Sequence, residues 1–368
     1  MRGQQHRSER IHRTDPRGGV AVTQITSDPR PSFNMYFEHN HFTPDSRTFI
    51  FTRQRDLSVG APRDLYRCDV DGTNMVQLSD EQDIYGIALS RDGRHAYYVQ
   101  GTTLKRVAMD TCELEEVVHV PDAQPGGVGM AGQTGDGRCL LCTMRVGDDV
   151  GLFRLATDGS GADLLYASPF VNHVSCDPGG DVVSFNGAIN GRRRFCVMDV
   201  AGGAPREFPM QRFAHCAWLG RTGRVQGCLL PPGRAIMSMA EDDERPQPIV
   251  AGPYFWHSGA SLDGEWIVAD TNWPDEGLQL VHVPTRSFTS LCDARAMNGD
   301  SLGGHPEPAI SPDGTVVIYT SNVTGMPQVY IARVPSEMRE ALRRSLEWQG
   351  EPCVAGDHYM PRHNWVRV

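Results

Sequence analysis

The sequence predicts an all-β fold, a single seven-bladed β-propeller with a short C-terminal helix, and three observations support this prediction. Turn-forming residues are abundant along the whole chain, since its 368 residues include 39 glycines and 25 prolines. A tight turn followed by an apolar strand recurs along the chain. The recurrence has a period of 41 to 50 residues, which is typical of four-stranded propeller blades.

The repeated turn occurs seven times, and each copy contains small or turn-forming residues. The turns are centred on Asp45, Asp92, Asp136, Gly179, Thr222, Asp263 and Asp313. β-Branched and aromatic residues follow, as in residues 48–51 (TFIF) and 316–319 (VVIY). We therefore expect each turn to join the innermost strand of a blade to the next strand outward.

The two ends of the chain lie outside the repeats. Residues 1–19 carry mixed charge without periodicity, so we expect a flexible arm. Residues 20–335 form the propeller, in which the strand-like segment 20–25 precedes the first repeat. That segment is expected to complete the last blade and close the ring, because closure removes an exposed sheet edge.

The C-terminal segment, residues 336–368, is expected to contain one helix and a tail. Residues 336–349 have apolar positions at helical spacing, and Ser336 is placed to cap the helix. The tail contains His358 and His363. It either adds a strand or lies over a channel mouth, and the sequence leaves both alternatives open.

The charge and hydropathy of the chain restrict its partners and location. With 35 basic and 45 acidic residues the net charge is −10, which disfavours binding to nucleic acid or anionic membranes. The first thirty residues lack the apolar core of a signal peptide, and no apolar run approaches the roughly 18 residues that span a bilayer. We therefore expect a cytoplasmic protein; the sequence does not predict its oligomeric state.

Histidines cluster just before the repeated turns. Six of the chain's 13 histidines lie four to eight residues before a turn, in five different repeats: His39, His41, His173, His215, His257 and His305. One interpretation is a set of polar channel residues bonded to water or to backbone carbonyls. Convergence from five blades favours a functional cluster instead, because imidazoles around one cavity suit divalent metal binding and proton transfer.

Several short motifs in the chain resemble the oligogalacturonate lyases, cytoplasmic seven-bladed propellers of pectin catabolism. The sharpest are residues 305–308 (HPEP), 311–314 (SPDG), 320–322 (TSN), 325–327 (GMP) and 330–332 (YIA). Further similarity lies around His215, His257, His173 and Arg193. The resemblance covers about residues 20–335.

This resemblance implies β-elimination on a small acidic oligosaccharide, in which a base removes the proton at C5 and the C4–O4 bond breaks to leave an unsaturated uronate. It implies that His215 is the base and that Arg193 pairs with the uronate carboxylate. It also implies that His257, His305 and Glu307 hold a divalent ion, which would be manganese, with magnesium or calcium as alternatives.

The other residues expected near the channel mouth are assigned to substrate binding. They are His39, His41, His173 and Arg194. Arg193 and Arg194 belong to a run of three arginines at 192–194, and a solvated turn is the simpler interpretation for Arg193.

Two positions depart from the pattern of the oligogalacturonate lyases. Glu307 stands where the family has histidine, which shifts the preference toward harder ions. Leu302 stands where the family has a glutamine ligand three residues before His305, so that one ligand is lost. Either the metal site is weakened or lost, or a substitute ligand serves, namely water, Asp300, His358 or His363.

Two other functions remain open from the sequence. One is a lyase for a different uronate, with sugar binding altered by Tyr254, Phe255 or Trp273. The other is a non-catalytic propeller of the TolB type that binds a protein or a sugar. A histidine cluster at the channel mouth argues against a pure scaffold.

Overall fold

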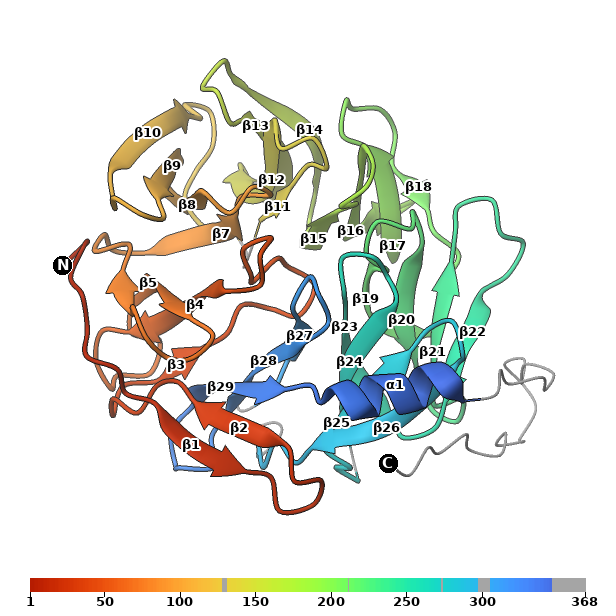
Figure 1. The fold of residues 1–368 in the computed structure, drawn as a ribbon. Helices are drawn as coiled ribbons and strands as arrows, with labels where there is room; N and C mark the ends of the chain where they lie inside the picture. The colour runs from red at the N-terminus through yellow and green to blue at the C-terminus, as the bar shows by residue number, and fades with distance from the viewer. Residues whose placement is uncertain (128–130, 211, 273, 297–304, 346–368) are drawn as a thin grey trace. The chain divides into compact units, whose positions relative to one another are not determined.

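The computed structural model describes residues 1–127, 131–210, 212–272, 274–296 and 305–345. The strands in these ranges form seven antiparallel sheets, and the fold is the predicted seven-bladed β-propeller with one short C-terminal helix (Figure 1). By internal packing the chain divides into two units. Unit 1 comprises Met1–Arg7, His39–Asp69 and Asn74–Pro209; unit 2 comprises Ser8–Glu38, Val70–Thr73 and Met210–Val368.

Unit 1 contains the strands of the first four repeats except β3, the first strand of the first sheet. The first repeat contributes β4 (Thr48–Gln54), β5 (Arg63–Asp69) and β6 (Val76–Gln77). The second forms β7 (Ile84–Leu89), β8 (His95–Gln100), β9 (Thr103–Ala108) and β10 (Leu114–His119). The third forms β11 (Gly132–Gln133), β12 (Cys139–Val146), β13 (Asp149–Ala156) and β14 (Ala162–Ser168). The fourth forms β15 (Asn172–Cys176), β16 (Val182–Ile189), β17 (Arg192–Asp199) and β18 (Arg206–Glu207).

Unit 2 contains the last three repeats and the N-terminal strands. The fifth repeat forms β19 (Phe213–Trp218), β20 (Val225–Leu229), β21 (Ala235–Met239) and β22 (Gln247–Ala251). The sixth forms β23 (Phe255–Ala260), β24 (Trp266–Thr271), β25 (Leu278–His282) and β26 (Ser287–Cys292). The seventh forms β27 (Ala309–Ile310), β28 (Val316–Ser321) and β29 (Gln328–Arg333), and unit 2 also includes β3 (Ser32–Phe33).

Each predicted turn lies directly before the second strand of its sheet; in the first repeat that strand is β4, which pairs in sheet order after β3. In five turns a Ser or Thr hydroxyl two residues before the central aspartate donates to that carboxylate, at 2.6–2.7 Å. The same carboxylate accepts a backbone N–H two residues later. These bonds within the turn satisfy backbone donors and explain why the motif recurs.

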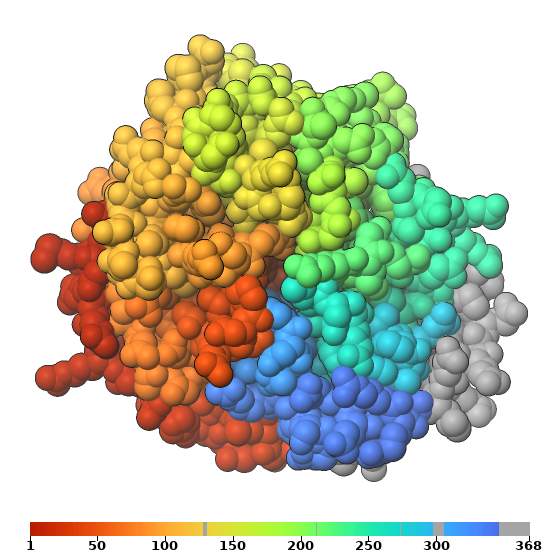
Figure 2. Space-filling model, turned by 45° about the horizontal axis from the view of Figure 1, so that its top comes forward, coloured from red at the N-terminus to blue at the C-terminus, as the bar shows by residue number. Residues whose placement is uncertain are grey.

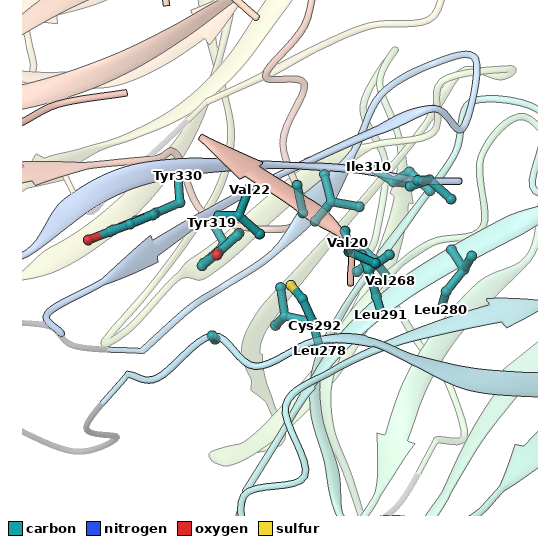
Figure 3. Packing of buried hydrophobic residues seen from close by; sticks show 14 of the residues in the cluster. Val20, Val22, Val268, Leu278, Leu280, Leu291, Cys292, Ile310, Tyr319 and Tyr330 are labelled. Atoms are coloured by element: carbon teal, nitrogen blue, oxygen red, sulfur yellow. The ribbon is translucent and has the colours of Figure 1, made fainter. Parts of the chain in front are cut away.

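The segment before the first repeat completes the last sheet, as predicted. β2 (Ala21–Gln24) pairs with β29 through Val22 opposite Ala332. Val20 and Val22 are buried in a cluster with Ile310 and Tyr330 (Figure 3). Burial of each valine stabilises the fold by ~1.5–3 kcal/mol.

The N-terminal arm differs from the expectation of a segment without regular structure. β1 (Ile11–Thr14) pairs with β2 and adds a fifth strand to the last sheet. In unit 1, Gln5 bridges Val76. Every side chain of β1 is exposed. The strand is held by its backbone pairing with β2, to which His12 and Arg13 add side-chain hydrogen bonds, so no apolar pattern indicates it.

Helix α1 (Ser336–Arg344) forms at the predicted place. Its N-cap position is Pro335, and Ser336 is the first helical residue instead of the cap. Met338 and Leu342 are buried in the core of unit 2, and the helix packs against β25 and β26. Atoms of this blue C-terminal part of the chain lie at the surface in Figure 2. No helix among the described residues is long and apolar enough to cross a membrane.

Candidate functional site

A β-bulge recurs in the first strand of several sheets and carries three of the predicted histidines. Between Ala214 and Ala217, β19 contains one residue more than its partner β20. His215 lies in this bulge, and the same excess occurs in β23 around His257 and in β15 around His173. Bulges redirect side chains and are common beside active sites.

The first strands of the last three repeats lie side by side in unit 2, with β19 against β23 and β23 against β27 (Figure 1). Gly259 allows part of this approach, because a Cβ there would lie 2.8 Å from the carbonyl oxygen of Pro308. His215, His257 and His305 come from these three repeats. Their ring centroids are 4.1 Å apart for His215 and His257, and 5.6 Å apart for His257 and His305.

His215 is half-buried and has a left-handed backbone, with φ of 55°. Its Nδ1 lies 2.7 Å from the carbonyl oxygen of Trp256. A carbonyl only accepts hydrogen bonds, so Nδ1 carries the hydrogen and the neutral ring has its lone pair on Nε2. Nε2 is therefore the atom with which His215 can act as a base.

His257 is 3% exposed and is bound by a buried carboxylate, that of Asp270. Nδ1 of His257 lies 2.9 Å from Oδ2 of Asp270, and the backbone N–H of His257 donates to Oδ1 at 2.6 Å. Burial lowers the pKa of His257, but the charge and hydrogen bond of Asp270, with the charges of Glu307 and Glu38, raise it above the ordinary value overall. The bond also leaves Nε2 as the acceptor atom of the neutral ring.

Glu307 lies between His305 and β27 and has a left-handed backbone, with φ of 45°. Its N–H donates to Oδ2 of Asp270 at 3.3 Å, and its carbonyl accepts from the side chain of Asn34 at 2.7 Å. The hydroxyl of Thr320 donates to Asn34 in turn. These bonds hold the backbone of Glu307 next to the histidines, at a φ that costs ~1–2 kcal/mol for a non-glycine residue.

Four residues that the sequence did not indicate complete this group: Tyr36, Phe37, Glu38 and Asp270. The rings of Tyr36 and Phe37 lie 5.7 and 5.3 Å from that of His257. Burial raises the pKa of Tyr36, and the charges of Glu38, Glu307 and Asp270 raise it further. The one available signal was Asp270 itself, a carboxylate that directly follows four apolar residues in strand β24.

The predicted ligands fit a divalent ion by chemical type. Two imidazoles and a carboxylate suit manganese or a similar ion, and a carboxylate bound to the far nitrogen of an imidazole is typical of metal-binding histidines. Within the described ranges, however, no three His, Cys, Asp or Glu side chains are grouped to hold a metal. Leu302, Asp300, His358 and His363 lie outside the described residues, so the ligand set stays a prediction.

The other predicted residues belong to unit 1. Arg193 is exposed on β17, with its guanidinium 4.7 Å from the ring centre of Phe170. Arg194 forms an ion pair with Glu207 at 2.9 Å, which a bound carboxylate would have to displace. These assignments to substrate contact stay predictions.

The predicted site histidines of unit 1 are partly or fully buried. His41 is 1% exposed, and its Nδ1 bonds to the carbonyl of His39 at 2.8 Å. His173 is half-buried with φ of 53°, close to the φ of His215. His41 is therefore bonded to a backbone carbonyl, as the simpler interpretation of the histidines expects. His173 lies in a bulge of β15 that is of the same kind as the bulge of β19 around His215.

The aromatic residues considered for sugar binding differ in burial. Phe255 is 1% exposed and packs against Phe288, so it belongs to the core instead of a sugar-binding surface. Tyr254 is half-buried with its ring 5.6 Å from Trp256. Trp273 lies outside the described residues.

Comparison with known proteins finds similarity to proteins that are named as lyases, both in sequence and in fold. The chain is 22% identical to the oligogalacturonate lyase of Dickeya dadantii, covering 87% of this chain and 95% of the relative. It is 22% identical to the oligogalacturonide lyase of Pectobacterium atrosepticum, covering 88% and 96%. A solved oligogalacturonate lyase in complex with manganese superposes with a TM-score of 0.78 at 20% identity, covering 92% and 99%.

No protein-family model matches the chain. The similarity nevertheless extends over most of this chain and nearly all of each relative. It confirms the predicted resemblance: over most of its length this chain is similar to oligogalacturonate lyases.

Proposed function

We propose that this protein is a lyase that cleaves short uronic-acid oligosaccharides of the oligogalacturonate type by metal-assisted β-elimination. The observation that carries the proposal is the pair His215 and His257, whose rings lie 4.1 Å apart and whose Nδ1 atoms both face fixed acceptors. The names of the relatives support the substrate class and the reaction. We further propose that the reaction takes place in the cytoplasm.

In the proposed reaction, His215 acts as the base through Nε2. It takes the proton from C5 of the uronate, the electron pair of that C–H bond forms the C4=C5 double bond, and the C4–O4 bond breaks. The leaving oxygen then takes a proton from water. A positioned base of this kind contributes about 10²–10⁴-fold to the rate.

The C5 proton is weakly acidic because the neighbouring carboxylate is ionised. We assign His257, His305 and Glu307 to hold a divalent ion, which would supply positive charge to that carboxylate and to the enolate-like charge that develops. Manganese is the first choice, because a solved relative of this fold is a manganese complex. Arg193 is proposed to pair with a carboxylate of the substrate.

A spectroscopic assay tests the proposal. The full-length protein is incubated with di- and trigalacturonate, with and without manganese, and the absorbance of the conjugated double bond is followed. We expect an unsaturated product whose formation rises with manganese. The absence of product from galacturonates and other uronate oligosaccharides at every metal concentration contradicts the proposal.

A further inference from the structure

One peptide group lies between His215 and the carboxylate of Asp270. Its carbonyl, from Trp256, accepts the Nδ1 hydrogen of His215 at 2.7 Å. Its N–H, from His257, donates to Oδ1 of Asp270 at 2.6 Å. The other carboxylate oxygen, Oδ2, faces Nδ1 of His257 at 2.9 Å. Asp270 is thus bonded directly to one histidine and through a single peptide to the other.

We propose that Asp270 is a positioning residue that sets the tautomer of both histidines, directly for His257 and through the Trp256–His257 peptide for His215. The proposal rests on the proposed function for the roles of the two rings as ligand and base. The tautomers themselves can be measured without substrate, so their outcome is separate from that of the lyase assay.

The tautomers of both rings follow from the chemistry of their acceptors. An ionised carboxylate and a backbone carbonyl only accept hydrogen bonds, so each ring must present Nδ1–H to its acceptor and retain its lone pair on Nε2. A carboxylate on the N–H side of a peptide polarises the group and strengthens its carbonyl as an acceptor, by about 10–30% per bond in a hydrogen-bonded chain. Asp270 is 2% exposed, so water screens this effect very little.

The bulge in β23 contributes to this arrangement. One extra residue between Phe255 and Ser258 interrupts the regular pairing with β24, and in this stretch the N–H of His257 points to the Asp270 side chain. Oδ2 of Asp270 also accepts the N–H of Glu307 at 3.3 Å. One buried carboxylate therefore connects three of the predicted site residues, which come from three successive repeats.

Asp270→Asn tests the proposal because an amide keeps the shape of the side chain and has only one accepting atom. Either orientation of the new amide leaves one of the two His257 donors facing an NH₂ group. The backbone N–H cannot change, whereas the imidazole can move its hydrogen to Nε2. We therefore expect His257 to change tautomer in this variant.

The measurement is ¹⁵N NMR of the full chain labelled at histidine. A pH of about 9, well above the ordinary histidine pKa near 6.5, is chosen because the pKa of His257 is raised. The rings are assigned with His215→Gln and His257→Gln. In the wild-type protein both residues should show Nδ1–H and an accepting Nε2. In Asp270→Asn, His257 should show Nε2–H, and the Nδ1 signal of His215 should shift while its tautomer is retained.

Asp15→Asn is the matched control in the same unit. Asp15 is 5% exposed, and its carboxylate accepts backbone N–H groups of Arg17, Gly18 and Asp293. This variant should leave the signals of both rings unchanged. Titration with manganese alone, followed by calorimetry, should show affinity about 10–100-fold weaker in Asp270→Asn than in Asp15→Asn.

Three results would overturn the proposal: an Nε2–H tautomer of either ring in the wild-type protein, an unchanged His257 in a folded Asp270→Asn variant, or equal effects of the two variants on both rings. If Asp270→Asn does not fold, the wild-type spectrum still tests the proposed tautomers of His215 and His257. Both rings must then show Nδ1–H protons that are shifted downfield and exchange slowly.

Discussion

The bulges of β7 and β19 have the same geometry and contain different residues. In β7 the extra residue lies between Tyr85 and Ala88, and Gly86 there has φ of 57°. In β19 the equivalent residue is His215, with φ of 55°. A Cβ at Gly86 would lie 3.1 Å from a methyl group of Val99, whereas the ring of His215 packs against that of Trp256 at 4.4 Å.

This comparison separates a property of the fold from a property of the site. Glycine adopts the left-handed conformation at little cost, whereas a residue with a Cβ pays ~1–2 kcal/mol. The bulge is therefore part of the blade, and the residue that occupies it decides whether the blade contributes a functional group. A strained histidine where another blade has glycine indicates a function.

The largest effect is expected from His215→Ala. Loss of the base should reduce turnover of a galacturonate oligomer by about 10²–10⁴-fold, with substrate binding nearly unchanged, because proton removal belongs to the transition state. The rate is measured by the absorbance of the unsaturated product and binding by calorimetry. Added manganese should not restore the rate. Near-normal activity would transfer the role to another bulge histidine, His173 first.

His257→Ala should have a smaller effect of a different kind. His257 is proposed to bind the metal, so its loss should weaken manganese affinity by about tenfold or more. Turnover should fall at low manganese and recover in part when manganese is raised. Rates that do not depend on the metal in either protein would contradict the assignment of His257 as a ligand.

Gly86→Ala tests the bulge that lacks a histidine. The alanine must adopt a positive φ, and its Cβ lies close to the Val99 side chain. The free energy of unfolding should therefore fall by ~1–2 kcal/mol. Urea unfolding measures this change. Activity per folded molecule should remain that of the wild-type protein, and a selective loss of turnover would show that β7 contributes to the site.

The smallest expected effect is the difference between His215→Gly and His215→Ala. Both variants remove the imidazole and should be equally inactive. The glycine variant should be more stable by about 1 kcal/mol, because only the alanine retains a Cβ at φ of 55°. Equal stability in urea unfolding would show that the bulge in β19 relaxes when the ring is absent.

The sequence by itself determined the blades, the ring-closing strand and the short helix. Turn chemistry and alternating apolar residues are local, so the seven turns, β2 and α1 could be predicted from the sequence. The positions of His215, His257 and His305 before those turns were visible for the same reason. The roles that we propose for these histidines come from the resemblance to the oligogalacturonate lyases. The fold of unit 2 brings their rings close together.

Only the tertiary structure decided which groups surround these histidines. Asp270 is 13 residues from His257, and Asn34 is 273 residues from Glu307 along the chain. Side chains alternate between the two faces of a strand, so the sequence indicates which face a residue occupies. A bulge of one extra residue reverses this alternation, and the amino-acid composition gives no sign of it. β1 also could not be predicted from the sequence, because an exposed strand that is held by backbone pairing and polar side-chain bonds has no apolar pattern.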